Sequence, residues 1–215
     1  DAPADPTAYA LERQAQSLAD LLQLLEAAPA TVVGYSMGSR IALVLAMGHP
    51  ASVARLVLES PSAGIIDDAD RASRRDADER LAEEIERDGT ESFVQRWEAM
   101  PIFASHTDLA DDVMAHQRAE RRRHSAPGLA ASLRGAGQGT MAPLHEHLAR
   151  IACPTLVIAG GRDAAGLERA TTVAAGIPGA RLEVIAEAGH TPHLEAVPEF
   201  LRHTNDFLSV SPVTA

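Results

Sequence analysis

The stretch Thr31-Val32-Val33-Gly34-Tyr35-Ser36-Met37-Gly38-Ser39-Arg40, followed by the apolar run 41–47, decides the fold. A β-branched run enters Gly-x-Ser-x-Gly directly, which predicts a strand, a sharp turn and a helix, the pattern of a nucleophile elbow. We expect Gly34 and Gly38 to lie where a Cβ would collide with neighbouring backbone. Ser36 would then project from a strand end, and the backbone N–H of Met37, in the first helical turn, is a candidate oxyanion donor. The alternative is a strand-to-helix connection without chemistry.

Composition narrows the classes of function. The chain has 215 residues and a net charge of −11, which favours one domain with an insertion and argues against nucleic acid or an anionic membrane surface as partner. It contains no lysine, so Schiff-base and Ser-Lys chemistry are excluded. The lone Cys153 is expected to be a buried structural thiol. No run is long enough for a membrane span and residues 1–6 do not look like a signal peptide, so we expect a cytoplasmic protein.

The rest of the chain alternates between apolar runs and amphipathic stretches. Besides the elbow strand, strands are predicted over 55–60, 154–159 and 181–186, and helices over 7–26, 166–175 and 194–207. Two strands joined by a helix form a right-handed crossover, so the sheet is expected to be parallel. This is an α/β pattern.

Residues 64–143 differ from the flanking sequence because they are charged, helix-forming and without strand runs. Helices are predicted over 68–88, 91–100, 108–124 and 127–134. We therefore predict a core made of residues 1–63 and 144–215 with a helical lid insertion at 64–143. A purely structural helical subdomain is the alternative.

Three polar residues follow three predicted strands. Ser36, Asp163 and His190 each come directly after a strand, and parallel strands end at one edge of the sheet. Serine needs an imidazole to accept its proton, and a carboxylate then orients that imidazole. Taken alone, Asp163 reads as a turn residue or helix N-cap and His190 as a loop histidine. Together they predict a catalytic triad.

Two other histidine positions receive less weight. His193 competes with His190 for the role of base, but it lies at the start of the last predicted helix and not directly in the turn after the strand. The run His145-Glu146-His147 has too little spacing for a helical metal face, so no metal is predicted.

On these residues the chain resembles the α/β-hydrolase fold, and specifically the 2-succinyl-6-hydroxy-2,4-cyclohexadiene-1-carboxylate (SHCHC) synthases of menaquinone biosynthesis. The segments that carry the resemblance are 34–40, 56–60, 93–103, 128–135 and 188–195. Many α/β-hydrolases share the elbow and the final His segment, whereas the lid segments and Arg40 are more specific. The fold so implied is a parallel sheet flanked by helices, with a helical lid.

The resemblance implies a lyase that uses no cofactor and acts on a small polycarboxylate. In that family the triad removes a proton from 2-succinyl-5-enolpyruvyl-6-hydroxy-3-cyclohexene-1-carboxylate and pyruvate leaves. The residues that it assigns to the substrate site are Tyr35 and Arg40 beside the serine, and Arg74, Trp97 and Arg118 from the lid. Guanidinium forks suit carboxylates, and Arg40 lies one helical turn after Ser36. Arg75 competes with its neighbour Arg74.

The resemblance also implies N-terminal strands and a His-Gly loop that supplies a second oxyanion donor. The sequence begins at Asp1 without them, so we expect the fold to lack these strands here. A longer parent chain, a complementing polypeptide and an inactive fragment are the three explanations left open. The competing functions are a generic serine hydrolase for a small ester or thioester, and a non-catalytic ligand-binding protein of the same fold.

Overall fold

The computed structural model describes residues 3–209, which form two compact units. The sheet unit comprises Ala15–Ala63 and His145–Ala215, and the helical unit comprises Asp1–Gln14 and Gly64–Leu144. The segment up to Gln14, assigned to the core on sequence, groups with the helical unit because its backbone lies directly against Gly135. A Cβ on Gly135 would stand 2.1 Å from the carbonyl oxygen of Pro6.

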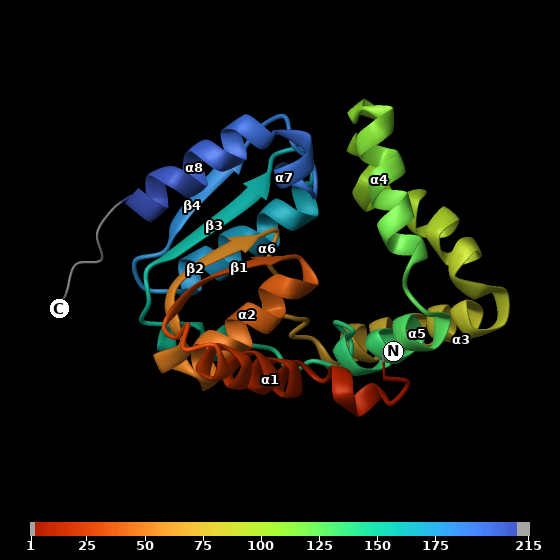
Figure 1. Ribbon diagram of the computed structural model, residues 1–215, viewed down its shortest axis with the longest axis horizontal. Helices are drawn as coiled ribbons and strands as arrows, with labels where there is room; N and C mark the ends of the chain where they lie inside the picture. The colour runs from red at the N-terminus through yellow and green to blue at the C-terminus, as the bar shows by residue number, and fades with distance from the viewer. Residues whose placement is uncertain (1–2, 210–215) are drawn as a thin grey trace. The chain divides into compact units, whose positions relative to one another are not determined.

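The sheet unit contains one parallel sheet. Its strands are β1 (Ala30–Tyr35), β2 (Val53–Glu59), β3 (Thr155–Gly160) and β4 (Arg181–Ile185), and they stand in the order β1-β2-β3-β4. The parallel arrangement predicted from the crossover pattern is confirmed, and Figure 1 shows the four strands side by side. All four carboxyl ends therefore meet at one edge of this sheet.

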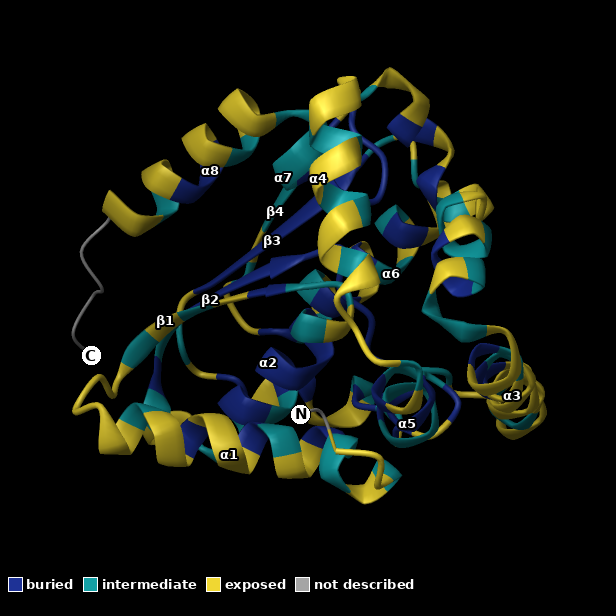
Figure 2. Ribbon diagram, turned by 45° about the vertical axis from the view of Figure 1, so that its right-hand side comes forward, coloured by how far each residue is buried: buried dark blue, intermediate teal, exposed yellow. Residues whose placement is uncertain are grey.

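Helices cover both faces of the sheet. Helix α8 (Val197–Ser209) lies on one face and α2 (Met37–Gly48) on the other, while α6 (Ala164–Gly176) packs on β3 and β4 (Figures 1 and 2). Helix α2 is buried over most of its length, as its apolar sequence requires. Under α8, the buried core consists of Val57, Leu156, Ile158, Ile185 and Ala188, with Phe200 and Phe207 packed against it.

Two helix boundaries in or near the sheet unit differ from the sequence prediction. The first helix, α1 (Leu11–Leu24), begins after a 3-10 turn at Pro6–Tyr9, because the Asp5 side chain caps that turn through the Thr7 N–H. The predicted last helix is two helices, α7 (Pro192–Glu195) and α8, separated at Ala196 where the backbone is not helical. Short 3-10 turns at Pro50–Ser52 and His145–Arg150 complete the unit.

The helical unit consists of α3 (Asp68–Glu98), a 3-10 segment at Pro101–Asp108, α4 (Asp111–Arg122) and α5 (Ala126–Ala136). Helix α3 is broken at Gly89, where φ is +80°, which agrees with the predicted end of a helix there. Residues 108–110, predicted as helix, precede the true start of α4 at Asp111. No helix in the described part of the chain is both long enough and apolar enough to cross a membrane.

Candidate active site at the elbow

Ser36 occupies the turn between β1 and α2. Its φ of +48° and ψ of −106° are strained for a residue with a side chain, and such strain is stored at functional turns. The Ser36 N–H donates to the carbonyl oxygen of Glu59 at 2.9 Å, which fixes the turn to the neighbouring strand. A Cβ on Gly34 would stand 2.6 Å from the Gly38 carbonyl oxygen, so only glycine fits under the turn.

The second elbow glycine does not play the part predicted for it. A Cβ built on Gly38 meets no atom within 4 Å, so the expected collision there is wrong. Position 38 is close to other backbone only through its own carbonyl group, which faces the Cα of Gly34. The residue that must be glycine for steric reasons is thus Gly34, on the strand side of the turn.

The structure brings Ser36, His190 and Asp163 together. His190 Nε2 lies 3.0 Å from Ser36 Oγ, and Nδ1 lies 2.7 Å from Asp163 Oδ2. Since an ionised carboxylate can only accept, Nδ1–H donates to Asp163 and Nε2 is left to accept from the serine hydroxyl. The imidazole is buried, with 4% of His190 exposed. This arrangement can take a proton from the serine hydroxyl and stabilise the resulting imidazolium.

Asp163 has both of the roles that were considered from the sequence: it caps a helix and it binds the histidine. Its Oδ1 accepts from the Gly166 N–H at 2.9 Å and caps α6, while Oδ2 holds His190. Burial raises the pKa of the Asp163 carboxyl, but the hydrogen bonds from His190 and the Gly166 amide outweigh it and hold the pKa below its ordinary value. The carboxylate therefore stays charged beside the imidazole.

Residues without a predicted role fix the loop that carries His190. Ser60 Oγ donates to the His190 carbonyl oxygen at 2.9 Å. The Glu195 carboxylate accepts from the N–H groups of Gly189 and Thr191 and from the Thr191 hydroxyl, at 2.6 to 2.9 Å. The only signal in the sequence was that Ser60 and Glu195 fall in segments typical of the family.

Of the two competing histidines, the structure brings His190 and not His193 to the serine. His193 lies in α7, where its backbone N–H and Nδ1 both bind Glu59 Oε1. The assignment of the base to His190 thus has a geometric basis.

Three further predicted residues lie near Ser36 in the sheet unit. Tyr35 precedes the serine and its ring centroid is 5.5 Å from that of His190. Arg40 lies on α2 and is 7% exposed, a burial that a guanidinium tolerates only with partners. Met37 begins α2, so its N–H belongs to the positive end of the helix.

The predicted lid residues all lie in the helical unit. Arg74 Nε donates to the buried carboxylate of Asp78 at 2.8 Å, whereas Arg75 donates to the Gly139 carbonyl oxygen. Trp97 contacts Phe93 and Phe103 with tilted rings, whose centroids are 5.3 and 5.6 Å away. The tryptophan is thus part of the packing of the helical unit.

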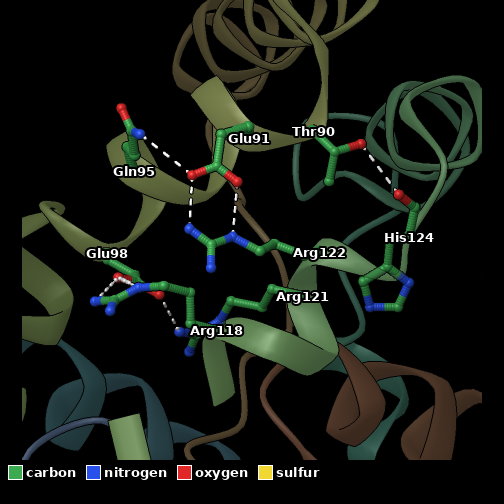
Figure 3. A network of polar contacts seen from close by, with 8 residues as sticks. All are labelled: Thr90, Glu91, Gln95, Glu98, Arg118, Arg121, Arg122 and His124. Carbon is green, nitrogen blue, oxygen red and sulfur yellow. Dashed lines mark hydrogen bonds and ion pairs between the residues drawn. The ribbon is translucent and has the colours of Figure 1, made fainter. Parts of the chain in front are cut away.

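Arg118 forms part of a polar network between α3 and α4 (Figure 3). Its Nε and Nη2 donate to Glu98 Oε2 at 3.0 and 2.7 Å, and Arg121 donates to the other oxygen of Glu98. Arg122, one helical turn after Arg118, binds Glu91 with two hydrogen bonds. Two of the three arginines at the end of α4 therefore bind α3.

Comparison with known proteins supplies the family. The sequence pattern of the alpha/beta hydrolase fold matches residues 1–197. The chain belongs to the α/β-hydrolase fold family. Within that family, a putative SHCHC synthase of Bacillus subtilis (strain 168) is 37% identical over 209 residues, which cover 97% of this chain and 76% of the relative. The fold and the resemblance inferred from the elbow and lid segments are thus confirmed.

Solved structures agree with this placement in the α/β-hydrolase family. MenH from S. aureus matches with a TM-score of 0.89 and 33% identity, over 93% of this chain and 75% of that one. A thermophilic esterase from Thermogutta terrifontis matches with a TM-score of 0.78 and 25% identity, over 93% and 72% of the two chains. The chain is therefore more similar to MenH than to this esterase.

Proposed function

We propose that this α/β-hydrolase is an SHCHC synthase, a carbon–oxygen lyase that eliminates pyruvate from 2-succinyl-5-enolpyruvyl-6-hydroxy-3-cyclohexene-1-carboxylate. The observation that carries the proposal is the 37% identity to the Bacillus protein over 97% of the chain. That coverage takes in residues 64–143 as well as the elbow and the triad. The elbow alone would support any member of the superfamily.

The triad serves this reaction as a base. His190 accepts the Ser36 proton through Nε2, and the activated serine oxygen removes a proton from the carbocycle. The electron pair of that C–H bond forms a new ring double bond, the ring double bond already present shifts by one position, and the bond between the ring and the enolpyruvyl oxygen breaks. The leaving enolpyruvate takes up the proton held by His190 and becomes pyruvate. The elimination needs no outside oxidant or reductant, so it needs no redox cofactor.

The substrate's carboxylates call for positive partners. We assign Arg40 and Tyr35 of the sheet unit to the substrate site beside Ser36. In the helical unit, Arg74, Trp97 and Arg118 are the residues that we propose for substrate binding if residues 64–143 act as a lid. Asp78 engages Arg74 through Nε and Glu98 engages Arg118 through Nε and Nη2. A guanidinium has five N–H donors, so these pairs orient each fork and leave other donors for a carboxylate.

Pyruvate release tests the proposal. The chain and its Ser36→Ala variant are given the enolpyruvyl substrate, and pyruvate is followed with lactate dehydrogenase and NADH. We expect turnover by the parent and a loss of about 10²- to 10⁴-fold in Ser36→Ala, the usual contribution of a general base. Ser52→Ala, in a 3-10 turn of the same unit, is the control and should keep full activity.

Two results would contradict the lyase assignment in different ways. Turnover of small esters without pyruvate release would assign the triad to a serine hydrolase, the second candidate, whose fold the Thermogutta esterase shares. Substrate binding that survives Ser36→Ala, with no reaction in the parent, would make the protein a ligand-binding member of the fold.

A further inference from the structure

A second pair of a carboxylate and an imidazole lies next to the triad in the sheet unit. Glu59 is 2% exposed, and its Oε1 accepts from the backbone N–H of His193 at 3.0 Å and from the Nδ1–H of the same residue at 2.8 Å. A buried carboxylate without hydrogen bonds destabilises a protein, so these two bonds tie α7 to the end of β2. Neither residue contacts Ser36 Oγ in the structure.

Strand register explains why this pair reaches the elbow. Tyr35, the last residue of β1, is the register partner of Glu59, the last residue of β2. Partners in adjacent parallel strands project from the same face of the sheet. The Glu59 carboxylate and the Tyr35 ring are therefore neighbours, and His193 packs on both.

Tyr35 lies between two imidazoles. Its ring centroid is 4.9 Å from that of His193, in an edge-on arrangement with planes at 63°, and 5.5 Å from that of His190. On its other side His193 contacts Phe200 of α8, at 6.2 Å between centroids. His193 thus fills the space between the core under α8 and the tyrosine beside the triad.

We propose that His193, oriented by Glu59, is a positioning residue that fixes the Tyr35 ring beside His190. This inference rests on the proposed function, in which Tyr35 lines the substrate site. The Glu59 bond holds the imidazole in one orientation, in which it meets the Tyr35 ring in an edge-to-face contact. Without that edge, the Tyr35 ring gains rotational freedom and substrate binding loses a preformed wall.

His193→Asn separates the positioning role from a structural one. The asparagine side chain keeps an N–H that can donate to Glu59, but it lacks the ring edge that meets Tyr35. We expect a folded protein whose KM for the enolpyruvyl substrate rises about tenfold while kcat changes less than threefold, the range of a contact between neighbours. In a Tyr35→Ala background the same substitution should change KM less than twofold.

His203→Ala is the matched control. His203 is also buried and lies against a carboxylate, with Nδ1 3.1 Å from Glu183 Oε2, but it belongs to α8 and no ring contact joins it to Tyr35 among the described residues. It should lower the melting temperature without raising KM. If His193→Asn and His203→Ala changed KM equally, His193 would have only a structural role.

A spectroscopic readout keeps the inference independent of turnover. The chain has two tyrosines, so ¹³C-tyrosine labelling gives few ring signals, and Tyr9→Phe assigns them. We expect His193→Asn to shift the Tyr35 ring signals and leave those of Tyr9 in place. Unchanged Tyr35 signals, or KM effects of His193→Asn and Tyr35→Ala that simply multiply, would overturn the positioning role. A parent that releases no pyruvate but shows the shift would instead refute the proposed function.

Discussion

Gly166, three residues after Asp163, has no side chain, and this leaves room for the triad carboxylate. A Cβ at this position would stand 2.0 Å from Asp163 Oδ2, the oxygen that holds His190. We expect Gly166→Ala to turn the carboxylate away and lower kcat about 10²-fold, the usual cost of a small misplacement of a catalytic group. Pyruvate release and the melting temperature are the two measurements.

The melting temperature of this variant should change little, because the gain from alanine as the better helix former inside α6 offsets the loss of the Asp163 cap. Gly48→Ala is the control: a Cβ there meets no atom within 4 Å, so both activity and stability should stay close to the parent. Full activity of Gly166→Ala would mean that the carboxylate tolerates displacement and that the Asp163 geometry is not needed.

At the residue scale, the site residues that follow directly after strands were predictable from the sequence. The site residues whose roles depend on side-chain contacts were not. Ser36, Asp163 and His190 were predictable because each follows a strand of one parallel sheet. Glu59 was not, because its role depends on the β1/β2 register and on a helix that begins more than a hundred residues later. Gly38 was assigned a collision that in the structure belongs to Gly34 alone.

At the scale of elements, Glu98 links α4 to the second half of α3. Its side chain is 12% exposed and binds both Arg118 and Arg121, so Glu98→Gln leaves two guanidiniums with a weaker, uncharged partner. Discounting for the exposure of Arg118, we expect a loss of about 1 kcal/mol and faster hydrogen exchange over residues 111–122. Exchange followed by mass spectrometry measures the second effect.

Glu120→Gln on the same helix is the control for Glu98. Glu120 pairs with Arg123 across one turn, and both side chains are more than half exposed. Such a pair contributes little to stability, so exchange over residues 111–122 should match that of the parent. If both substitutions accelerated exchange equally, the network in Figure 3 would not be what holds α4.

Helices and strands were predictable where the spacing of apolar residues and a helix-ending residue, such as glycine, indicate the same boundary. Gly89 was expected to end a helix, and it breaks α3 with a positive φ. Boundaries failed beside short 3-10 turns: the predicted helix 7–26 includes the turn at Pro6–Tyr9, and the predicted helix 108–124 begins at the end of the turn at Pro101–Asp108. The role of residues 64–143 as a lid stays a proposal, since a structural subdomain would show the same amphipathic pattern.

At the scale of the whole molecule, paired carboxylates are concentrated in the helical unit. Hydrogen bonds from Arg134, Arg87 and Arg122 hold the pKa of several carboxyls there below their ordinary values, namely those of Glu79, Glu86, Asp88 and Glu91. In the sheet unit the corresponding carboxyl is Asp163. A lowered folded-state pKa stabilises the fold above the ordinary pKa, and the stabilisation is lost as the pH falls through the lowered value.

Acid should therefore open the helical unit first, because protonation of these carboxyls, below their ordinary pKa, also leaves its many arginines unpaired and mutually repulsive. Two unique residues report the units separately. Trp97, the lone tryptophan, lies in the helical unit. Cys153, the lone cysteine, lies in the sheet unit, where it is half-buried and not the fully buried thiol that the sequence predicts. We expect Trp97 fluorescence to change at a higher pH than that at which the reaction of Cys153 with 4,4′-dithiodipyridine accelerates. Added salt should bring the pH values of the two transitions closer together, because it screens the repulsion between the arginines. Coincident transitions, or earlier exposure of Cys153, would show that the arginine pairs of the helical unit do not set its acid stability.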